Sequence, residues 1–268
     1  MRIVSLNAWG GREWSALSDW VPRVGSDILC LQEVIRAPVA SPEWLEYKDP
    51  FRTLSQRSDL YADVSALLPT HQASFAPAAR GNLSDGKRPV LSEHGIASWV
   101  APHLAVTAQR HDFAHGTFRP NGWGAEPVPR AIMAQRIWDP SSGRTVLIAQ
   151  FHGLRDPSGK GDTPARRAQS VRVIAFLAEI RRPGEPCILA GDLNVLPDNP
   201  MFDELAAIGL SDLVTGRGHA DTRTSLYTKP QRYADYMLVS QEIRVSGFDV
   251  PAEPEVSDHR PLILDFEL

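Results

Sequence analysis

The sequence predicts an α/β fold in which two mixed β-sheets pack as a sandwich flanked by helices, a four-layer α/β/β/α arrangement. Two observations predict it. Apolar runs of strand length recur along the chain, and several follow one another with only turn sequence between them, which indicates antiparallel hairpins. Other stretches repeat apolar residues every three or four positions, the period of a helix with one buried face. Sheets and helices of this kind bury their apolar faces against each other in layers.

The chain opens with a strand, a helix and a second strand. Residues 2–8 alternate enough to form the first strand, and residues 27–34 are a short apolar run that follows Gly25. Between them, apolar residues recur at three- and four-residue spacing from Trp14 to Val24, which predicts a helix.

The middle of the chain is dominated by expected strands. An apolar helical face predicts one helix over residues 56–68, which ends before Pro69. Turn sequence separates the strand-like runs that follow, at about 71–76, 95–100, 103–109, 130–138 and 144–152. Three segments rich in proline, glycine and aromatic residues are expected to be long surface loops, over 36–53, 77–94 and 111–129.

The last third of the chain mixes both kinds of element. Thr163 is a predicted N-cap with Pro164 at the first helical position, and a stripe that includes Val171 and Leu177 is predicted to be the buried face of that helix. The other expected elements are a strand at 186–191, a short helix at about 200–208, and strands near 234–239, 243–249 and 261–267.

The composition excludes several classes of protein. Hydrophobic residues make up 43% and charged residues 22% of the 268 residues, which argues against disorder, coiled coil or collagen-like structure. The longest apolar runs are far shorter than the about 20 residues that span a bilayer. We expect one domain over residues 1–268, no transmembrane segment and, because no signal-peptide pattern is visible at the start, a cytoplasmic location.

Charge and cysteine content narrow the expected chemistry. The net charge of −4 provides no general attraction to polyanions, and no long run of Lys or Arg is present. Both observations weigh against a protein that stays bound to DNA. Cys30 and Cys187 each lie inside an apolar run with no second cysteine nearby, so we expect both to pack in the core.

Polar side chains follow several of the predicted strands. They are Asn7, Glu33, His152, and the pair Asp192 and Asn194. Strand ends are where a rigid sheet presents side chains to a shared cavity. Any one of these residues is more often a cap or a turn residue, because Asp and Asn bond readily to nearby backbone. Their number is what indicates a site.

Four short motifs occur in one order along the chain: Leu31-Gln32-Glu33-Val34, Gly191-Asp192-Leu193-Asn194, Tyr233-Ala234-Asp235-Tyr236-Met237 and Ser257-Asp258-His259-Arg260-Pro261. With them the chain resembles, over nearly its whole length, the endonuclease/exonuclease/phosphatase superfamily. That superfamily includes pancreatic deoxyribonuclease, apurinic-site endonucleases, neutral sphingomyelinases and inositol polyphosphate 5-phosphatases. The resemblance implies a sandwich of two sheets flanked by helices, in agreement with the prediction from the residues.

The resemblance also implies a metal site. Glu33 would be the principal ligand, with Asn7 and Asp258 beside or near the metal. Hard oxygen ligands suit Mg²⁺ or Mn²⁺, and water and the substrate's phosphate would complete the coordination.

Catalytic roles follow from the same resemblance. Asp192 would orient and deprotonate the attacking water, and Asn194 would donate to a phosphate oxygen as charge builds up. Asp235 would hold His259 so that its imidazole contacts the phosphate, as a base or as a ligand. His152 matches a phosphate-binding histidine of many of these phosphatases and phosphodiesterases, which weighs slightly against the DNA-repair branch.

Two departures from the family pattern affect these assignments. Members often have Thr-His-Leu where this chain has Phe151-His152-Gly153-Leu154, so the residues after His152 are expected to be displaced by one. Arg166 and Gln169 resemble a recurring Arg-x-x-Gln pair of the family, although an arginine on a helix more often lies on a solvated face.

The segment 111–124 mixes aromatic residues, histidines and an arginine. It fits either a substrate-binding rim or a self-packed surface loop. As a rim, Arg119 or Arg130 would bind phosphate, while Phe118 or Trp123 would pack on an apolar or base moiety.

The residues and the resemblance together predict a metal-dependent hydrolase of phosphate esters, a phosphodiesterase or phosphatase that uses in-line attack by water. The expected partner is a phosphoester substrate, namely a small molecule, a lipid or a nucleic-acid end, with no obligate protein partner evident. One alternative is a nuclease or DNA-repair endonuclease of the same superfamily, which a cluster of Lys and Arg around the site would favour. The other is a catalytically silent binding module on the same scaffold.

Overall fold

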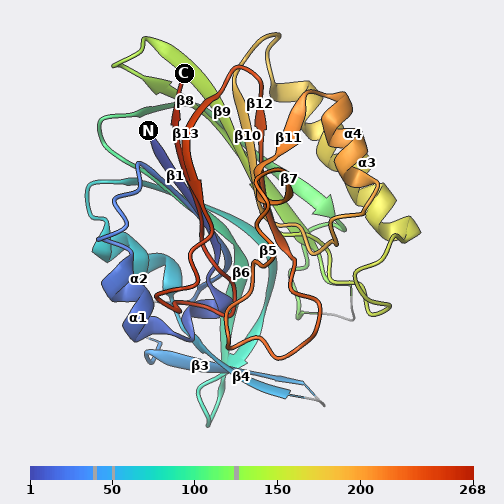
Figure 1. Ribbon diagram of the computed structural model, residues 1–268. Coiled ribbons are helices and arrows are strands. Elements are labelled where there is room, and N and C mark those ends of the chain that lie inside the picture. The colour runs from blue at the N-terminus through green and yellow to red at the C-terminus, as the bar shows by residue number, and fades with distance from the viewer. Residues whose placement is uncertain (39–40, 50–51, 124–126) are drawn as a thin grey trace.

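Two β-sheets form the centre of the protein. The computed structural model describes residues 1–38, 41–49, 52–123 and 127–268, and Figure 1 shows the sheets lying face to face. The first sheet has eight strands in the order β13 (Arg244–Asp249), β14 (Leu262–Glu267), β1 (Arg2–Asn7), β2 (Ile28–Arg36), β6 (Pro89–Val100), β5 (Gln72–Ser84), β3 (Trp44–Asp49) and β4 (Arg52–Arg57). The second has six, in the order β11 (Leu210–Asp212), β12 (Asp235–Ser240), β10 (Cys187–Asp192), β9 (Arg144–Phe151), β8 (Arg130–Asp139) and β7 (Ala105–His115).

Each sheet is mixed, and its one parallel pair lies near the centre. β1 pairs with β2 in parallel in the first sheet, and β10 pairs with β9 in parallel in the second, while the remaining pairs are antiparallel. Parallel neighbours end at the same edge of a sheet. The two parallel pairs therefore bring four chain segments together at one end of the sandwich.

Helices cover the outer faces of both sheets, as the sequence predicts (Figure 1). The first sheet is covered by α1 (Trp14–Trp20) and α2 (Leu60–Leu67), whose Leu17 and Val64 pack in the same apolar cluster as Leu29 of β2. The second is covered by α3 (Pro164–Ile180) and α4 (Met201–Ala207). The fold is an α/β/β/α sandwich. A 3₁₀ turn, η1 (Trp9–Gly11), and a short helix, α5 (Leu213–Gly216), complete the elements.

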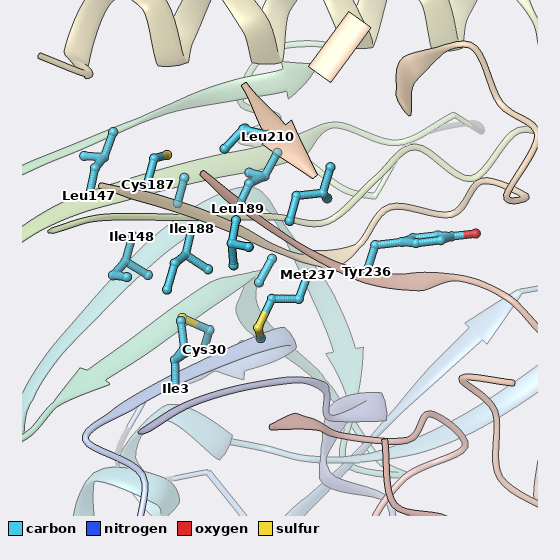
Figure 2. Close-up of a cluster of buried hydrophobic side chains, with 14 of the residues drawn as sticks. Ile3, Cys30, Leu147, Ile148, Cys187, Ile188, Leu189, Leu210, Tyr236 and Met237 are labelled. Carbon is cyan, nitrogen blue, oxygen red and sulfur yellow. The ribbon is translucent and has the colours of Figure 1, made fainter. Parts of the chain in front are cut away.

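The main core lies between the sheets. Figure 2 shows Ile3 and Cys30 of the first sheet facing Ile148, Ile188 and Met237 of the second. Alternate residues of β9 and β10, including Leu147 and Cys187, point to the other face, toward the helices. Both cysteines are free and buried, as predicted. Among the described residues, no helix combines the length and apolar character required to cross a lipid bilayer.

The predicted surface loops are largely wrong. Within 36–53 the chain forms β3 and the start of β4, and most of 77–94 belongs to the long β5–β6 hairpin. The third predicted loop, 111–129, begins as strand, because β7 continues to His115. The helix expected at 56–68 is shorter for the same reason, since β4 occupies its first residues. Residues 39–40, 50–51 and 124–126 of the predicted loops lie outside the described residues.

The predicted buried face of α3 is right at Leu177, which is buried, but wrong at Val171. Val171 is 64% exposed, and the buried positions include Arg166, Gln169, Val173 and Phe176. The polar residues Arg166 and Gln169 occupy this face because their side chains form hydrogen bonds with backbone atoms beneath the helix. The N-terminal end agrees with the prediction: the Thr163 side chain accepts from a backbone N–H in the first turn, and Pro164 is the first helical residue.

Candidate active site

The predicted site residues come from both sheets and meet at one end of the sandwich. Asn7 ends β1, Glu33 lies in β2, and Asp258 and His259 precede β14, all in the first sheet. The second sheet contributes His152 after β9, Asp192 at the end of β10, and Asp235 at the start of β12, where it pairs directly with Asp192. Below these groups, Gln32 Nε2 donates to Gln150 Oε1 at 3.0 Å and so joins the two sheets.

Asp192 is the centre of the arrangement. It is 2% exposed; its Oδ2 accepts from Asn7 Nδ2 at 3.0 Å and its Oδ1 accepts from the backbone N–H of Asn194 at 3.0 Å. The same Oδ2 lies 3.6 Å from His152 Nε2 and 3.7 Å from His259 Nε2. One carboxylate oxygen therefore faces both imidazoles, while hydrogen bonds fix the carboxylate from the side of the protein.

The tautomer of His152 follows from its neighbour Arg130. A guanidinium can only donate, so the contact of 3.1 Å between Arg130 Nη1 and His152 Nδ1 makes Nδ1 an acceptor. Burial, with Arg130 next in effect, lowers the pKa of His152 well below its ordinary value, so the ring is neutral. Its proton is then on Nε2, which faces Asp192 and lies 3.9 Å from Glu33 Oε1.

His259 lies between a carboxylate and a guanidinium. The predicted contact with Asp235 is present, with 2.8 Å between His259 Nδ1 and Asp235 Oδ2. On the other side of the ring, Arg223 Nη1 donates to Nε2 and also to Asp258 Oδ2, at 3.1 Å. Nε2 is thus an acceptor, and Nδ1–H donates to Asp235. Burial lowers the pKa of His259 to about 4, so this imidazole is also neutral at pH 7.

Two glycines let the strand ends that carry His152 and Asp192 approach each other. A Cβ on Gly153 would lie 2.1 Å from the carbonyl oxygen of Leu193, and one on Gly191 would lie 2.1 Å from that of Phe151. The backbone N–H of Gly153 donates to the carbonyl of Asp192 at 2.6 Å. This close packing is the physical reason for glycine after His152, where the family pattern has a larger residue.

Glu33 and Asp258 present oxygen atoms suited to a cation. Burial raises the pKa of Asp258, and Glu33 adds to the effect, so negative charge is crowded here. Asp258 Oδ1 is buried with no hydrogen-bond partner among the described residues, which is unusual for a carboxylate oxygen. Burial opposes ionisation of Glu33, but the electrostatic attraction of His94 and of neighbouring groups outweighs it and lowers the pKa of Glu33. These hard donors fit Mg²⁺ or Mn²⁺.

A second set of possible metal ligands overlaps the site. Asp192, Asp235 and His259 can each bring one ligand atom within 4.8 Å of the others. However, both nitrogens of His259 already have hydrogen-bond partners, and both oxygens of Asp235 contact its Nδ1. We therefore favour the set of Glu33 and Asp258. Asn7 is fully buried; its amide donates to Asp192 and accepts from the N–H of Trp9, and its side chain also helps to lower the pKa of Glu33, so it lies between the two carboxylates.

The site opens into a cavity of about 550 Å³. Its described lining includes Glu33, His152, Asp192, Asn194, Asp258 and His259. Seven Lys or Arg side chains line it against four Asp or Glu: Arg12, Arg130, Arg155, Lys160, Arg166, Arg223 and Lys229 against Glu33, Asp156, Asp192 and Asp258. The cavity is thus richer in cations than the whole chain, whose net charge is −4. That balance suits an anionic ligand.

The two predicted substrate-binding arginines differ in position. Arg130 lines the cavity, but Arg119 is not among the described lining residues, and its Nη1 donates to the carbonyl of Trp123 at 3.0 Å. Of the two aromatic residues proposed for the rim, Trp123 lines the cavity and Phe118 does not.

Several residues of the cavity were not predicted from the sequence. His94 of β6 lies beside His152, with 6.3 Å between ring centroids, and burial lowers its pKa to about 4. Arg223 and Lys160 come from loops, where nothing in the local sequence distinguishes them from solvated cations. Arg166, expected on a solvated face, is 2% exposed and donates to the carbonyl of Asn194 at 2.7 Å. The Arg-x-x-Gln resemblance was the available signal for it.

Comparison with known proteins agrees with this geometry. The model of the Endonuclease/Exonuclease/phosphatase family matches residues 4–259. The chain belongs to this family. A relative in Escherichia coli strain K12, the uncharacterized protein YbhP, is 24% identical over 256 residues, which cover 94% of this chain and 87% of YbhP.

Solved structures of the family share the fold. A mannosyl-6-phosphatase of Bacteroides thetaiotaomicron superposes with a TM-score of 0.69 at 17% identity, covering all of both chains. The catalytic domain of human Nocturnin with a bound sulfate anion gives a TM-score of 0.66 at 19% identity, covering 100% of this chain and 93% of that one. Members of this family are hydrolytic enzymes that act on phosphoester or nucleic-acid substrates and generally depend on a divalent metal.

Proposed function

We propose that this chain, as one catalytic domain over residues 1–268, is a Mg²⁺- or Mn²⁺-dependent hydrolase of phosphate esters. The observation that carries the proposal is the position of Asp192 Oδ2, within 3.7 Å of the Nε2 atoms of both His152 and His259. The arrangement offers one general base and two imidazoles around a space open to the cavity. The phosphatase in the fold comparison supports the same chemistry.

The proposed reaction is a direct displacement at phosphorus. A water oxygen forms a bond to phosphorus, Asp192 accepts a proton of that water, and the bond to the ester oxygen breaks with its electron pair on the leaving group, which solvent protonates. Glu33 and Asp258 would hold the metal ion, which would polarise the phosphoryl oxygens and offset their charge. The products are an alcohol and a phosphate, without a covalent enzyme intermediate.

The remaining residues position the reacting groups. His152 donates through Nε2–H to the phosphate, and the second N–H of the Asn194 amide binds an oxygen of the transition state, where charge increases. Asp235 fixes the orientation of His259, and Asn7 fixes that of Asp192. Arg130 keeps the proton of His152 on the nitrogen that faces the substrate.

A panel of phosphate monoesters, diesters, nucleic acids and phospholipids tests this proposal, with Mg²⁺ or Mn²⁺ and with chelator. We expect hydrolysis of at least one ester class, abolished by chelator. Asp192→Asn, which keeps the shape of the side chain but replaces one accepting oxygen with an NH₂ group, should lower turnover about 10²–10⁴-fold, the usual effect of losing a general base. Full activity in chelator after metal stripping, or an unchanged rate in Asp192→Asn, would refute the mechanism.

The cations around the cavity favour one second candidate, a nuclease. Arg12, Arg155 and Lys229 line the same cavity as the catalytic groups, which is the feature that a nucleic-acid backbone would need. Cleavage of an oligonucleotide faster than any small ester, with affinity that falls steeply as salt rises, would establish this candidate over the first.

The cytoplasmic location expected from the sequence stays a prediction.

A further inference from the structure

Arg223 is a cation that contacts two of the predicted site residues, Asp258 and His259. Neither the family motifs nor the composition pointed to it. We propose that Arg223 is a phosphate-binding residue that selects the dianion of a phosphate monoester over a phosphate diester. The proposal rests on the hydrolase function proposed above and narrows its substrate class. It is carried by the hydrogen-bonding state, the fixed position and the charge of this one side chain.

Several N–H groups of the Arg223 guanidinium make no hydrogen bond to a described residue. It is 5% exposed and lines the cavity, yet only Nη1 makes hydrogen bonds, to Asp258 and His259. Its Nε is buried with no partner among the described residues, and Nη2 makes no bond to any of them. A buried arginine normally satisfies its five N–H groups, because each unpaired one loses the hydration it would have in water. The buried, unpaired Nε, together with an Nη2 that is free to donate, therefore suits an anionic ligand with more than one oxygen.

The backbone of Arg223 is held rigidly. Its N–H donates to Asp221 Oδ1 at 2.7 Å, and its carbonyl accepts from Arg232 at 2.9 Å and from Arg260 at 2.8 Å. Both of these arginines also bind Asp221 Oδ2. On the side-chain end, the guanidinium carbon lies 4.1 Å from the ring centroid of Tyr227, a cation–π contact. The side chain is therefore preorganised, and little entropy is lost when a ligand binds.

The guanidinium of Arg223 carries a positive charge at any physiological pH. Its Nη1 donates to Asp258 Oδ2 at 3.1 Å, so this charge lies next to the carboxylate that is proposed to bind the metal. Lys160, whose Nζ donates to the carbonyl of Tyr233, adds a second cation to the same cavity. With a divalent ion held by Glu33 and Asp258, the phosphate end of the cavity would carry an excess of positive charge.

This charge and geometry discriminate between the two ester classes. A monoester dianion offers three terminal oxygens, so two can accept from the planar fork of Arg223 while another faces the metal and His152. A diester has one negative charge fewer and replaces one terminal oxygen with an ester group, which would leave a donor of Arg223 unpaired against carbon. Unpaired buried donors are penalised strongly, so the diester should be the poorer substrate.

The kinetic test compares two substrates with one leaving group, 4-nitrophenyl phosphate and methyl 4-nitrophenyl phosphate. The wild-type protein should have the higher kcat/KM for the monoester. Arg223→Gln should lower that value by about 10²-fold, as expected for loss of a transition-state donor, and lower the value for the diester less than tenfold. Arg223→Lys keeps the positive charge but not the planar guanidinium. Its kcat/KM for the monoester should lie between the values of the wild-type protein and of Arg223→Gln. Arg217→Gln, an exposed arginine outside the cavity, is the matched control.

A binding measurement separates this inference from the proposed function. Inorganic phosphate, titrated into the metal-free and Mg²⁺-loaded protein by calorimetry, should bind the wild-type and Arg217→Gln proteins at least tenfold more tightly than Arg223→Gln. If the wild-type protein hydrolyses no ester but shows this difference, the hydrolase function fails and Arg223 remains a phosphate-binding residue. Equal losses on both esters, or unchanged phosphate affinity in Arg223→Gln and Arg223→Lys, would overturn the inference. Arg223→Lys provides the result if Arg223→Gln does not fold.

Discussion

Three described residues other than glycine hold their backbone in the left-handed region: Trp9 at φ 51°, Glu33 at φ 55° and Asn194 at φ 55°. All three line the cavity. Such a conformation costs about 1–3 kcal/mol and persists where surrounding structure enforces it, most often at functional sites. At Glu33 it coincides with a shift of register between β2 and β6, a bulge that interrupts the regular alternation of the strand. Local strain and the proposed metal ligand therefore occupy one position.

The residue-level prediction concerns Glu33→Gln. Loss of the charged carboxylate should remove most of the rise in melting temperature that Mg²⁺ or Mn²⁺ produces, and should lower turnover, without unfolding the metal-free protein. The free energy of unfolding without metal should decrease somewhat at pH 7, because the lowered pKa of Glu33 means that the folded protein favours its charged form, but the chain should stay folded. Thermal denaturation with and without metal measures both effects. Glu179→Gln, an acid on the outer side of α3 that is 58% exposed in its side chain, should respond to metal like the wild type. An equal metal response in both variants would remove Glu33 from the ligand set.

At the scale of elements, the strand ends after β9 and β10 pack with almost no spare room. Gly153→Ala should therefore push the Asp192 backbone away from His152, since its Cβ would lie 2.1 Å from the Leu193 carbonyl. We expect a loss of about 1–3 kcal/mol in the free energy of unfolding, as for other overpacked sites, and reduced turnover. Gly161→Ala, in the same connection, meets no atom within 4 Å and should be close to neutral. Urea denaturation and steady-state kinetics of the two variants measure the contrast.

A buried ion pair joins the end of α3 to β8. Arg136 Nε donates to Glu185 Oε1 at 2.5 Å, and Arg136 Nη2 donates to Glu185 Oε2 at 3.0 Å and to the carbonyl of Ile180 at 2.6 Å. Burial raises the pKa of Glu185, but the hydrogen bonds from Arg136 outweigh burial and lower it overall. A depressed carboxyl pKa contributes stability that is present above the unfolded value of about 4.3 and is lost as pH falls through the folded value.

Glu185→Gln should therefore be less stable than the wild type at pH 7 by about 1.5–3 kcal/mol, and the difference should shrink below about pH 4.3. Urea denaturation at pH 7 and at about pH 3.5 checks this. Glu267→Gln breaks a pair in which both side chains are more than half exposed, so its effect should stay below about 1 kcal/mol at either pH. If the difference in the free energy of unfolding between Glu185→Gln and the wild type did not change with pH, the contribution of Glu185 to stability would come from packing rather than from its charge.

The same elements show how far the sequence alone could lead. The sandwich of two mixed sheets and the capped start of α3 were predictable, because apolar period and capping chemistry are local signals. The start of β5 was predicted at about 71–76, but its extension to Ser84 was missed because that part contains Pro77 and Gly81, residues typical of loops, and its pairing with β6 overrides them. At the site, strand-end residues such as Asp192 were found through their motifs. Arg223 was missed because what distinguishes it, burial against Asp258, exists only in the folded chain.

At the scale of the whole molecule, the site is divided between the two sheets. Asn7 and Glu33 lie in strands of the first sheet and Asp258 precedes its strand β14, while Asp192 ends β10 of the second sheet and His152 follows its strand β9. Their separation therefore depends on how the sheets pack over the core between them. Protein interiors are close-packed, so a change in that core is transmitted rather than absorbed.

Two neighbouring residues of β10 test this dependence. Ile188 faces the other sheet (Figure 2), while Leu189, on the opposite face of the strand, packs toward the helices, and both are fully buried. Ile188→Ala and Leu189→Ala should each lower the free energy of unfolding by about 2–5 kcal/mol. Below the unfolding transition, only Ile188→Ala should also lower kcat, because only that cavity lies between the two halves of the site. Equal kcat in both variants would show that the sheets keep their spacing without Ile188.

The place of β14 beside β1 has a consequence for the order of events during synthesis. Arg2 binds Asp265 through two hydrogen bonds, and the first strand of the chain has β14 as the neighbour on one of its edges. Until the ribosome has released residues 258–267, that edge of β1 has no partner and Asp258 and His259 are missing from the cavity. A nascent chain that has already folded its second sheet therefore still cannot complete the site, so the proposed hydrolysis requires that residues 2–7 and 258–267 have met.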